Sequence, residues 1–136
     1  MKEIRPVVKA IIVKDNKILL LQRNEEFSKG ETFLDIPGGG MLFGESHEDA
    51  IFREIREEVN LDVNLTGIIS NWSHMVDDEL HLVGITFLAK YVSGDIKLSD
   101  EHKNYQWVNL NKINYVEVPK WLENEIQIAI KKYKII

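Results

Sequence analysis

The chain has 136 residues, 44% of them hydrophobic, which fits one domain over residues 1–136 with a single core. Cysteine is absent, and this excludes disulfides, thiol nucleophiles and thiolate zinc sites. Its 22 acidic and 17 basic residues give a net charge of −5 without a basic run, which disfavours a nucleic acid polymer as partner, and the lack of a long apolar run favours a cytoplasmic protein without a membrane segment.

The N-terminal part of the chain is predicted to form strands that lead into a glycine-rich turn. Apolar and β-branched runs predict strands over residues 7–13, 17–23 and 33–36. Asp15 and Asn16 predict a hairpin between the first two, and the polar residues 24–32 predict a loop before the third. Pro37 and Gly38–Gly40 follow. Because glycine lets the backbone approach a ligand closely, this turn can present backbone groups to a phosphate or a metal ion.

A helix is predicted between two capping residues. Ser46 is a good N-cap with Asp49 three residues on, and Asn60 favours the left-handed conformation that ends many helices. At 100° per residue, one side of this helix carries three carboxylates, Glu54, Glu57 and Glu58. The other side is apolar and expected to be buried, with Ile51, Phe52, Ile55 and Val59.

The acidic side of this helix holds most of the net charge. Residues 45–58 contain six acidic and two basic residues, a charge of −4. Carboxylates at i, i+3 and i+4 repel one another, so a counter-charge is expected. Hard cations such as Mg²⁺ prefer oxygen ligands and bridge protein carboxylates to substrate phosphates. A solvated acidic face is the alternative, and the glycine turn nearby favours the metal site.

The remainder of the chain is predicted to be mostly strands, closed by a second helix. Strands are expected over residues 61–65, 67–74, 81–92 and 105–110. Asp77–Glu79 is a polar turn, and Pro119 opens a helix whose apolar rhythm continues to about Tyr133. Strands with one helix in mid-chain and one at the C-terminus predict an α/β (α+β) fold whose sheet is covered on both faces.

The glycine turn and the acidic helix together resemble the Nudix box, the signature of Nudix (MutT-like) hydrolases. In that signature a glycine, a glutamate and an Arg-Glu-aliphatic-x-Glu-Glu-x-Gly-aliphatic run stand at fixed separations. The corresponding residues are Gly39, Glu45, Arg53, Glu54, Ile55, Glu57, Glu58, Asn60 and Leu61. Asn60 replaces the usual glycine, and asparagine also tolerates the left-handed conformation. The resemblance covers nearly the whole chain.

The resemblance implies an α/β/α sandwich with a mixed sheet and a set of site residues. The cofactor would be Mg²⁺ or Mn²⁺, held by the carbonyl of Gly38 and by Glu54, Glu57, Glu58 and Glu101. Arg53 would pair with Glu45 to orient the helix carboxylates. Either Glu101 or Glu57 would accept the proton from the attacking water.

The resemblance also implies the reaction, the hydrolysis of a phosphoanhydride in a nucleoside di- or triphosphate derivative. No proline stands between Glu58 and Val118, and this favours a (deoxy)nucleoside triphosphate or a modified one over ADP-ribose or a nucleotide sugar. A nucleotide sensor that binds without cleaving is the non-enzymatic alternative. Many relatives are homodimers, so a homodimer is a further expectation.

Substrate-contacting residues are harder to select. Arg23 is either a phosphate contact or an exposed arginine at a strand end, and Gly39 lies in the turn that can face phosphate. Phe43 and Trp72 could stack on a nucleobase, although aromatic residues in strands usually lie in the core. His102 adjoins Glu101 and is expected to be exposed to solvent.

Overall fold

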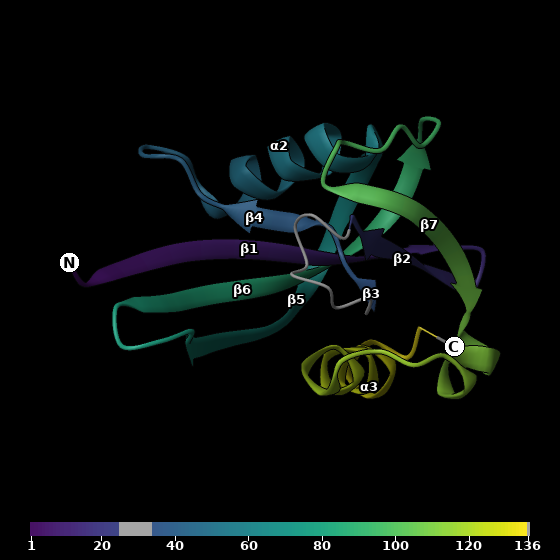
Figure 1. Ribbon diagram of the computed structural model, residues 1–136. Helices are drawn as coiled ribbons and strands as arrows, with labels where there is room; N and C mark the ends of the chain where they lie inside the picture. Colours follow the sequence, from purple (N-terminus) through teal and green to yellow (C-terminus); the bar gives the residue numbers. More distant parts are fainter. Residues whose placement is uncertain (25–33, 136) are drawn as a thin grey trace.

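The structure is a computed structural model that describes residues 1–24 and 34–135 (Figure 1). Its elements are β1 (Glu3–Lys14), β2 (Lys17–Arg23), β3 (Leu34–Asp35), β4 (Gly38–Gly40), α2 (His47–Val59), β5 (Asp62–Met75), β6 (Leu80–Ser93), β7 (His102–Asn109), the 3₁₀ helix η1 (Leu110–Tyr115) and α3 (Lys120–Tyr133). Neither of the described α-helices is long and apolar enough to cross a membrane.

The described strands form one mixed, seven-stranded sheet around β1. β1 pairs in parallel with β6, and β5 pairs antiparallel with β6 beyond it. The other edge of β1 is shared, since Val7–Lys9 pair with β4 while Val13 and Lys14 pair with β2. β2 in turn carries β3 and β7. β4 and β2 thus share one edge of β1, and the glycine strand β4 is the part of that edge in contact with α2.

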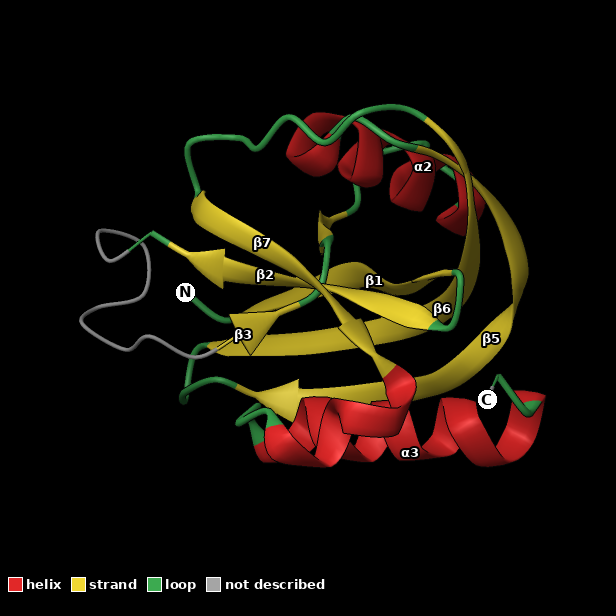
Figure 2. Cartoon of the chain, turned by 90° about the vertical axis from the view of Figure 1, so that its right-hand side faces the viewer, coloured by secondary structure: helices red, strands yellow, loops and turns green. Residues whose placement is uncertain are grey.

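Two helices cover opposite faces of this sheet, α2 above and α3 below (Figures 1 and 2). Side chains alternate along the strands between the two faces. On β2, Leu19 and Leu21 pack in the cluster that contains the apolar side of α2, whereas Ile18 and Leu20 pack in the cluster of α3. The predicted α/β/α sandwich with a mixed sheet is confirmed.

The local signals read from the sequence have the expected geometry. Asp15 and Asn16 have φ of 49° and 62°, and positive φ at both central residues is what a tight type I′ hairpin requires. Ser46 Oγ accepts the Asp49 N–H at 3.0 Å at the start of α2. Asn60 ends the helix at φ 62°, and its N–H bonds to the Arg56 carbonyl at 3.0 Å. The predicted hairpin and both helix caps are confirmed.

Two predictions about the sheet and α2 are wrong. The two strands expected over 61–65 and 67–74 are one continuous strand, β5, because β6 pairs along its whole length and register shifts absorb the irregular residues. Phe52 is 41% exposed rather than buried. The helix instead turns the edge that carries Ala50 and Ile51 toward the sheet, so Phe52 falls at the solvent side. The predicted loop over 24–32 lies outside the described residues from 25 onward.

Candidate functional site

Arg53 on α2 holds the loop before the helix against the helix itself. Its Nε and Nη2 donate to the two carboxylate oxygens of Glu45 at 2.7 and 2.9 Å, and Nη2 also donates to the Gly40 carbonyl at 3.0 Å. Glu45 accepts the Leu42 N–H at 2.7 Å as well. The hydrogen bond from Arg53 holds the pKa of Glu45 below its usual range. The structure thus brings together the predicted pair of Arg53 and Glu45, and the planar guanidinium makes a bidentate contact with the carboxylate.

The same guanidinium orients two of the predicted metal ligands. Its Nη1 donates to Glu54 at 2.9 Å and to Glu57 at 3.2 Å. The side chain of Glu54 is 13% exposed, and that of Glu57 is 58% exposed. Burial raises the pKa of Glu54 although Arg53 opposes the shift. A β-carbon on Gly39 would lie 2.7 Å from the Glu54 carboxyl carbon, so the absence of a side chain at Gly39 lets Glu54 lie against β4.

Glu58 is the most buried carboxylate of the helix, with 5% of its surface exposed. Its Oε1 accepts the Gly38 N–H at 2.7 Å. Burial raises the pKa of Glu58 to about 8, and the charges of Glu54 and Glu101 push the same way, which outweighs the hydrogen bond from Gly38. Gly38 was predicted to contribute its carbonyl, and the structure shows its N–H bound to the carboxylate.

The segment before β7 brings further side chains to this helix. The last carbonyls of a helix lack partners within the helix, and here the N–H groups of Lys97 and Ser99 satisfy those of Val59 and Glu58, each at 3.1 Å. The segment then runs on to Glu101, whose carbonyl accepts the Asn24 N–H at 2.7 Å. Glu101 is exposed and is one of the charges that act on Glu54 and Glu58.

His102 completes this cluster, and the expectation that it is exposed is wrong. It is 5% exposed because it is the first residue of β7 and pairs with Arg23 of β2. Ligand atoms of Glu58, Glu101 and His102 all lie within 4.8 Å of one another. Burial lowers the pKa of His102, which favours the neutral ring. Its place beside Glu101 was visible in the sequence, but its burial depends on the pairing of β7 with β2.

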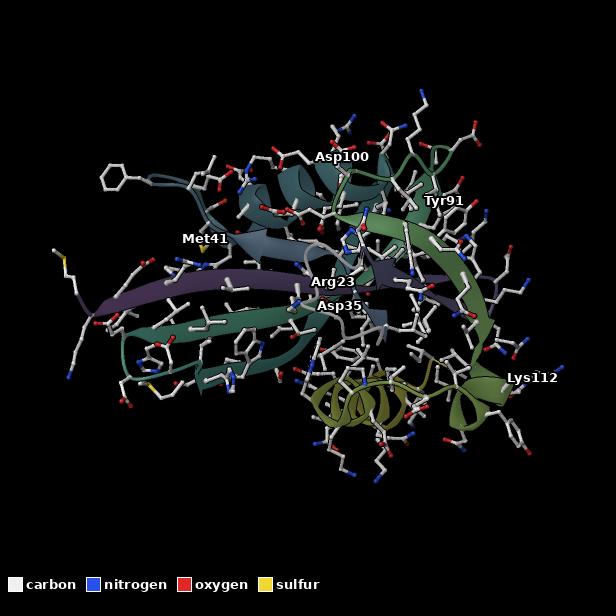
Figure 3. The ribbon with its side chains drawn as sticks, in the orientation of Figure 1. Arg23, Asp35, Met41, Tyr91, Asp100 and Lys112 are labelled. Carbon is white, nitrogen blue, oxygen red and sulfur yellow. The ribbon has the colours of Figure 1, made fainter. Side chains whose placement is uncertain are left out.

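Two positively charged side chains, Arg23 and Lys9, border the acidic cluster. Figure 3 shows Arg23 and Asp35 next to each other near the middle of the sheet. Arg23 Nη1 lies 3.9 Å from Asp35 Oδ2, and Lys9 Nζ lies 3.2 Å from Asp35 Oδ1. Asp35 is buried and also accepts the Ile36 N–H at 2.7 Å. The charges of these three residues act on His102, which places Arg23 at the border of the acidic cluster. Sequence reasoning missed Lys9 and Asp35.

The two aromatic candidates have different surroundings. Phe43 is fully exposed in the loop between β4 and α2. Trp72 Nε1 donates to Thr86 Oγ1 at 3.0 Å, and Thr86 donates to Glu125 of α3 at 3.0 Å. The indole therefore lies on the α3 face of the sheet. The structure does not bring Trp72 to the acidic side of α2.

A groove of about 500 Å³ lies over β1, β5 and β6 beside the start of α2. Its lining includes Met41, which Figure 3 shows near the end of β4, together with His47 and Asn71. None of the carboxylates of the acidic cluster lines it.

The fold and the site together define a class of protein. Carboxylates of one helix converge beside a glycine strand, an arginine orients them, and two further positively charged side chains lie at the border of the cluster. Oxygen donors of this kind suit divalent cations, which commonly bridge protein carboxylates to substrate phosphates. A family model described as the NUDIX domain matches residues 3–129. The chain belongs to the NUDIX family, and the family predicted from the sequence is confirmed.

Individual relatives agree with this assignment. An ADP-ribose pyrophosphatase of Methanocaldococcus jannaschii is 35% identical over 107 residues, which cover 78% of this chain and 62% of that protein. The nucleoside triphosphatase NudI of Escherichia coli is 28% identical over 115 residues, with 76% and 81% covered. The crystal structure of a MutT protein from Methanosarcina mazei Go1 is 30% identical, with a TM-score of 0.84 over 98% of this chain and 97% of that one. The chain thus spans less than two thirds of the length of the archaeal pyrophosphatase.

Proposed function

We propose that this chain is a metal-dependent pyrophosphohydrolase that cleaves a phosphoanhydride bond in a nucleoside di- or triphosphate derivative. One observation carries the proposal, the convergence of Glu54, Glu58 and Glu101 beside β4 with Arg53 holding the helix carboxylates in place. An acidic patch on an ordinary solvated helix does not need a glycine strand against it. Here Gly39 permits the contact of β4 with Glu54.

The residues present fit a divalent cation. Burial raises the pKa of both Glu54 and Glu58, so the protein compensates their negative charge incompletely. The donors are carboxylate oxygens, the ligand type that Mg²⁺ and Mn²⁺ prefer. Glu54, Glu57, Glu58, Glu101 and the Gly38 carbonyl would hold the ion. A divalent ion at this site neutralises phosphate charge and activates water.

The residues of the chain divide the remaining tasks. Arg53 holds Glu54 and Glu57 in place, and Glu45 anchors Arg53 to the loop. Arg23 and Lys9 supply positive charge for the substrate phosphates at the border of the site. Glu101 accepts the proton from the attacking water, and Glu57 is the alternative acceptor. Gly39 faces the phosphates, and a stacking contact of Phe43 or Trp72 with the base stays a prediction.

Two substrate classes have support. The lack of proline between Glu58 and Val118 and the similarity to NudI favour nucleoside triphosphates. The similarity to the ADP-ribose pyrophosphatase, which has the higher identity, favours ADP-ribose. Location in the cytoplasm, a single domain and a homodimer stay predictions.

A product screen tests the function. The protein is incubated with Mg²⁺ and with nucleoside triphosphates, oxidised nucleotides, ADP-ribose, nucleotide sugars or dinucleoside polyphosphates, and the products are separated by chromatography. A nucleoside monophosphate released together with pyrophosphate supports the triphosphate class, and AMP with ribose 5-phosphate supports ADP-ribose. Binding of nucleotides that are all recovered uncleaved would overturn the proposal in favour of a sensor.

A further inference from the structure

A buried ring nitrogen of His102 lacks a hydrogen-bond partner. The side chain is 2% exposed, and Nδ1 finds no partner among the residues that the structure describes. Buried polar atoms in native proteins are nearly always paired, so an unpaired one calls for an explanation. A ligand that accepts the lone pair of a neutral imidazole is one such explanation.

The groups around this nitrogen indicate the kind of ligand. Nδ1 lies 3.9 Å from Glu58 Oε2, which is too long for a hydrogen bond. The other oxygen of Glu58 is held by the Gly38 N–H at 2.7 Å. Glu101 adds a third ligand, since one ligand atom each of Glu58, Glu101 and His102 lies within 4.8 Å of the other two. Donor atoms that share one ion at about 2.0–2.2 Å each lie roughly 3 to 4 Å apart, so only a small adjustment is needed.

The donor set has a chemical preference. Two carboxylates alone suit Mg²⁺, which is bound through oxygen and keeps several waters. An imidazole nitrogen instead suits ions such as Zn²⁺, and affinity for Co²⁺ exceeds that for Mn²⁺ at nitrogen-containing sites. The buried histidine therefore biases this end of the cluster toward later transition-metal ions.

We propose that Glu58, Glu101 and His102 form a binding site for a transition-metal ion of the Zn²⁺ or Co²⁺ type, in which His102 Nδ1 is a direct ligand. The site shares Glu58 and Glu101 with the proposed pyrophosphohydrolase centre, and it rests on the proposed function only through these two shared carboxylates. It gives that centre a second metal preference. His102, buried with an unpaired Nδ1, is the residue that creates the preference.

Cobalt binding tests the site without any turnover. The full chain is titrated with Co²⁺ under visible absorption and, in parallel, with Mg²⁺ by calorimetry, and ¹H NMR of the Co²⁺ form is searched for the strongly shifted N–H proton of a ligated imidazole. The variants are His102→Gln and, as a matched control, His74→Gln, which alters an exposed histidine on β5. Melting temperatures establish that both variants fold.

We expect the shifted imidazole signal in the wild type and in His74→Gln but not in His102→Gln. Loss of the ligand weakens Co²⁺ binding at least about tenfold, since loss of an outer-shell partner alone costs 10 to 100-fold. Binding of Mg²⁺ changes less than about twofold. Equal weakening of both metals, unchanged Co²⁺ affinity, or a wild type without the shifted signal would overturn the proposal. The wild-type signal decides the question even if His102→Gln fails to fold.

The same sample separates this site from the proposed function. If the protein shows the imidazole signal but cleaves no nucleotide in the product screen, the metal site stands and the proposed hydrolase function fails. If the protein hydrolyses nucleotides with Mg²⁺ but never shows the signal, the proposed function stands and His102 is not a metal ligand.

Discussion

Gly39 and Glu54 are in such close contact that a β-carbon on the glycine would lie 2.7 Å from the carboxyl carbon of the glutamate. We therefore expect Gly39→Ala to push Glu54 out of its position beside β4. Misplacement of a catalytic group by about 1 Å can cost roughly 10²-fold in rate, so kcat should fall by about that factor. Steady-state hydrolysis of the best substrate from the product screen measures the change.

The neighbouring glycine supplies the control for this experiment. A β-carbon on Gly40 would lie 3.8 Å from its nearest neighbour, a side-chain carbon of Arg5, which is ordinary contact. Gly40→Ala should therefore retain most of the activity. Equal kcat values for the two variants would show that the contact between Gly39 and Glu54 is irrelevant to turnover.

Arg53→Lys tests whether the guanidinium positions the helix carboxylates. An ammonium is a compact charge that cannot engage both oxygens of Glu45 together with Glu54 and Glu57. We expect kcat to fall about 10²-fold because the carboxylates lose their orientation, while far-UV circular dichroism stays unchanged.

Arg56→Lys is the matched control on the same helix. Arg56 is 66% exposed, pairs with Asp62 and does not contact the acidic cluster. Its replacement should leave kcat within about twofold, because exposed ion pairs contribute little. An Arg53→Lys variant as active as Arg56→Lys would argue against the positioning role.

Glu101→Gln and Glu57→Gln distinguish the two candidate proton acceptors. Each change preserves shape, and both residues are exposed, so neither variant should unfold. Loss of a general base costs about 10²–10⁴ in kcat, and the acidic limb of the pH–rate profile disappears only in the variant that lacks the base. Glu48→Gln, at an exposed position in the first turn of α2, serves as the control. Near-normal turnover of Glu101→Gln with a large loss in Glu57→Gln would reverse our assignment.

The helix and its caps could be predicted from the sequence because their signals are local. Ser46 and Asn60 act on backbone groups within a few residues, and the spacing of Glu54 and Glu58 follows from helical geometry alone. The strands were predicted less well. A bulge in β5 interrupts the alternation of apolar side chains, so one strand resembled two.

The site was only partly predictable because its other residues meet through the sheet. His102 is buried by the pairing of β7 with β2, and Asp35 contacts Lys9 across 26 positions of sequence. A single sequence does not record such pairings. The position of Trp72 depends on which face of β5 it occupies, and an error of one residue in register reverses that face.

The buried carboxylate of Glu58 predicts a pH dependence of stability in metal-free protein. Its pKa is about 8 in the folded protein, against an ordinary value of 4.5. The folded state thus holds a proton that the unfolded state has released, and stability falls as pH rises from about 4.5 to about 8. We expect the melting temperature in EDTA to decrease across this range, and millimolar Mg²⁺ to reduce the decrease.

Glu58→Gln isolates the contribution of this group. The amide does not titrate, so the variant should lose much of the pH dependence between 4.5 and 8 while other groups keep theirs. Thermal unfolding followed by circular dichroism at several pH values measures both proteins. Parallel curves for wild type and variant would mean that Glu58 ionises in the folded state as it does in the unfolded chain.

Thr86 links the α3 side of the sheet to a buried carboxylate. Its hydroxyl is fully buried, donates to Glu125 at 3.0 Å and accepts from Trp72 Nε1 at 3.0 Å. Thr86→Val keeps the shape but leaves both partners one bond short, which should destabilise the protein by about 1–3 kcal/mol in urea unfolding. Thr66→Val removes the hydroxyl of an exposed residue on β5, which donates to the Leu88 carbonyl at 3.2 Å, and should cost under about 1 kcal/mol. Equal losses in the two variants would mean that Ser70, which also donates to Glu125 at 2.7 Å, satisfies the carboxylate without Thr86.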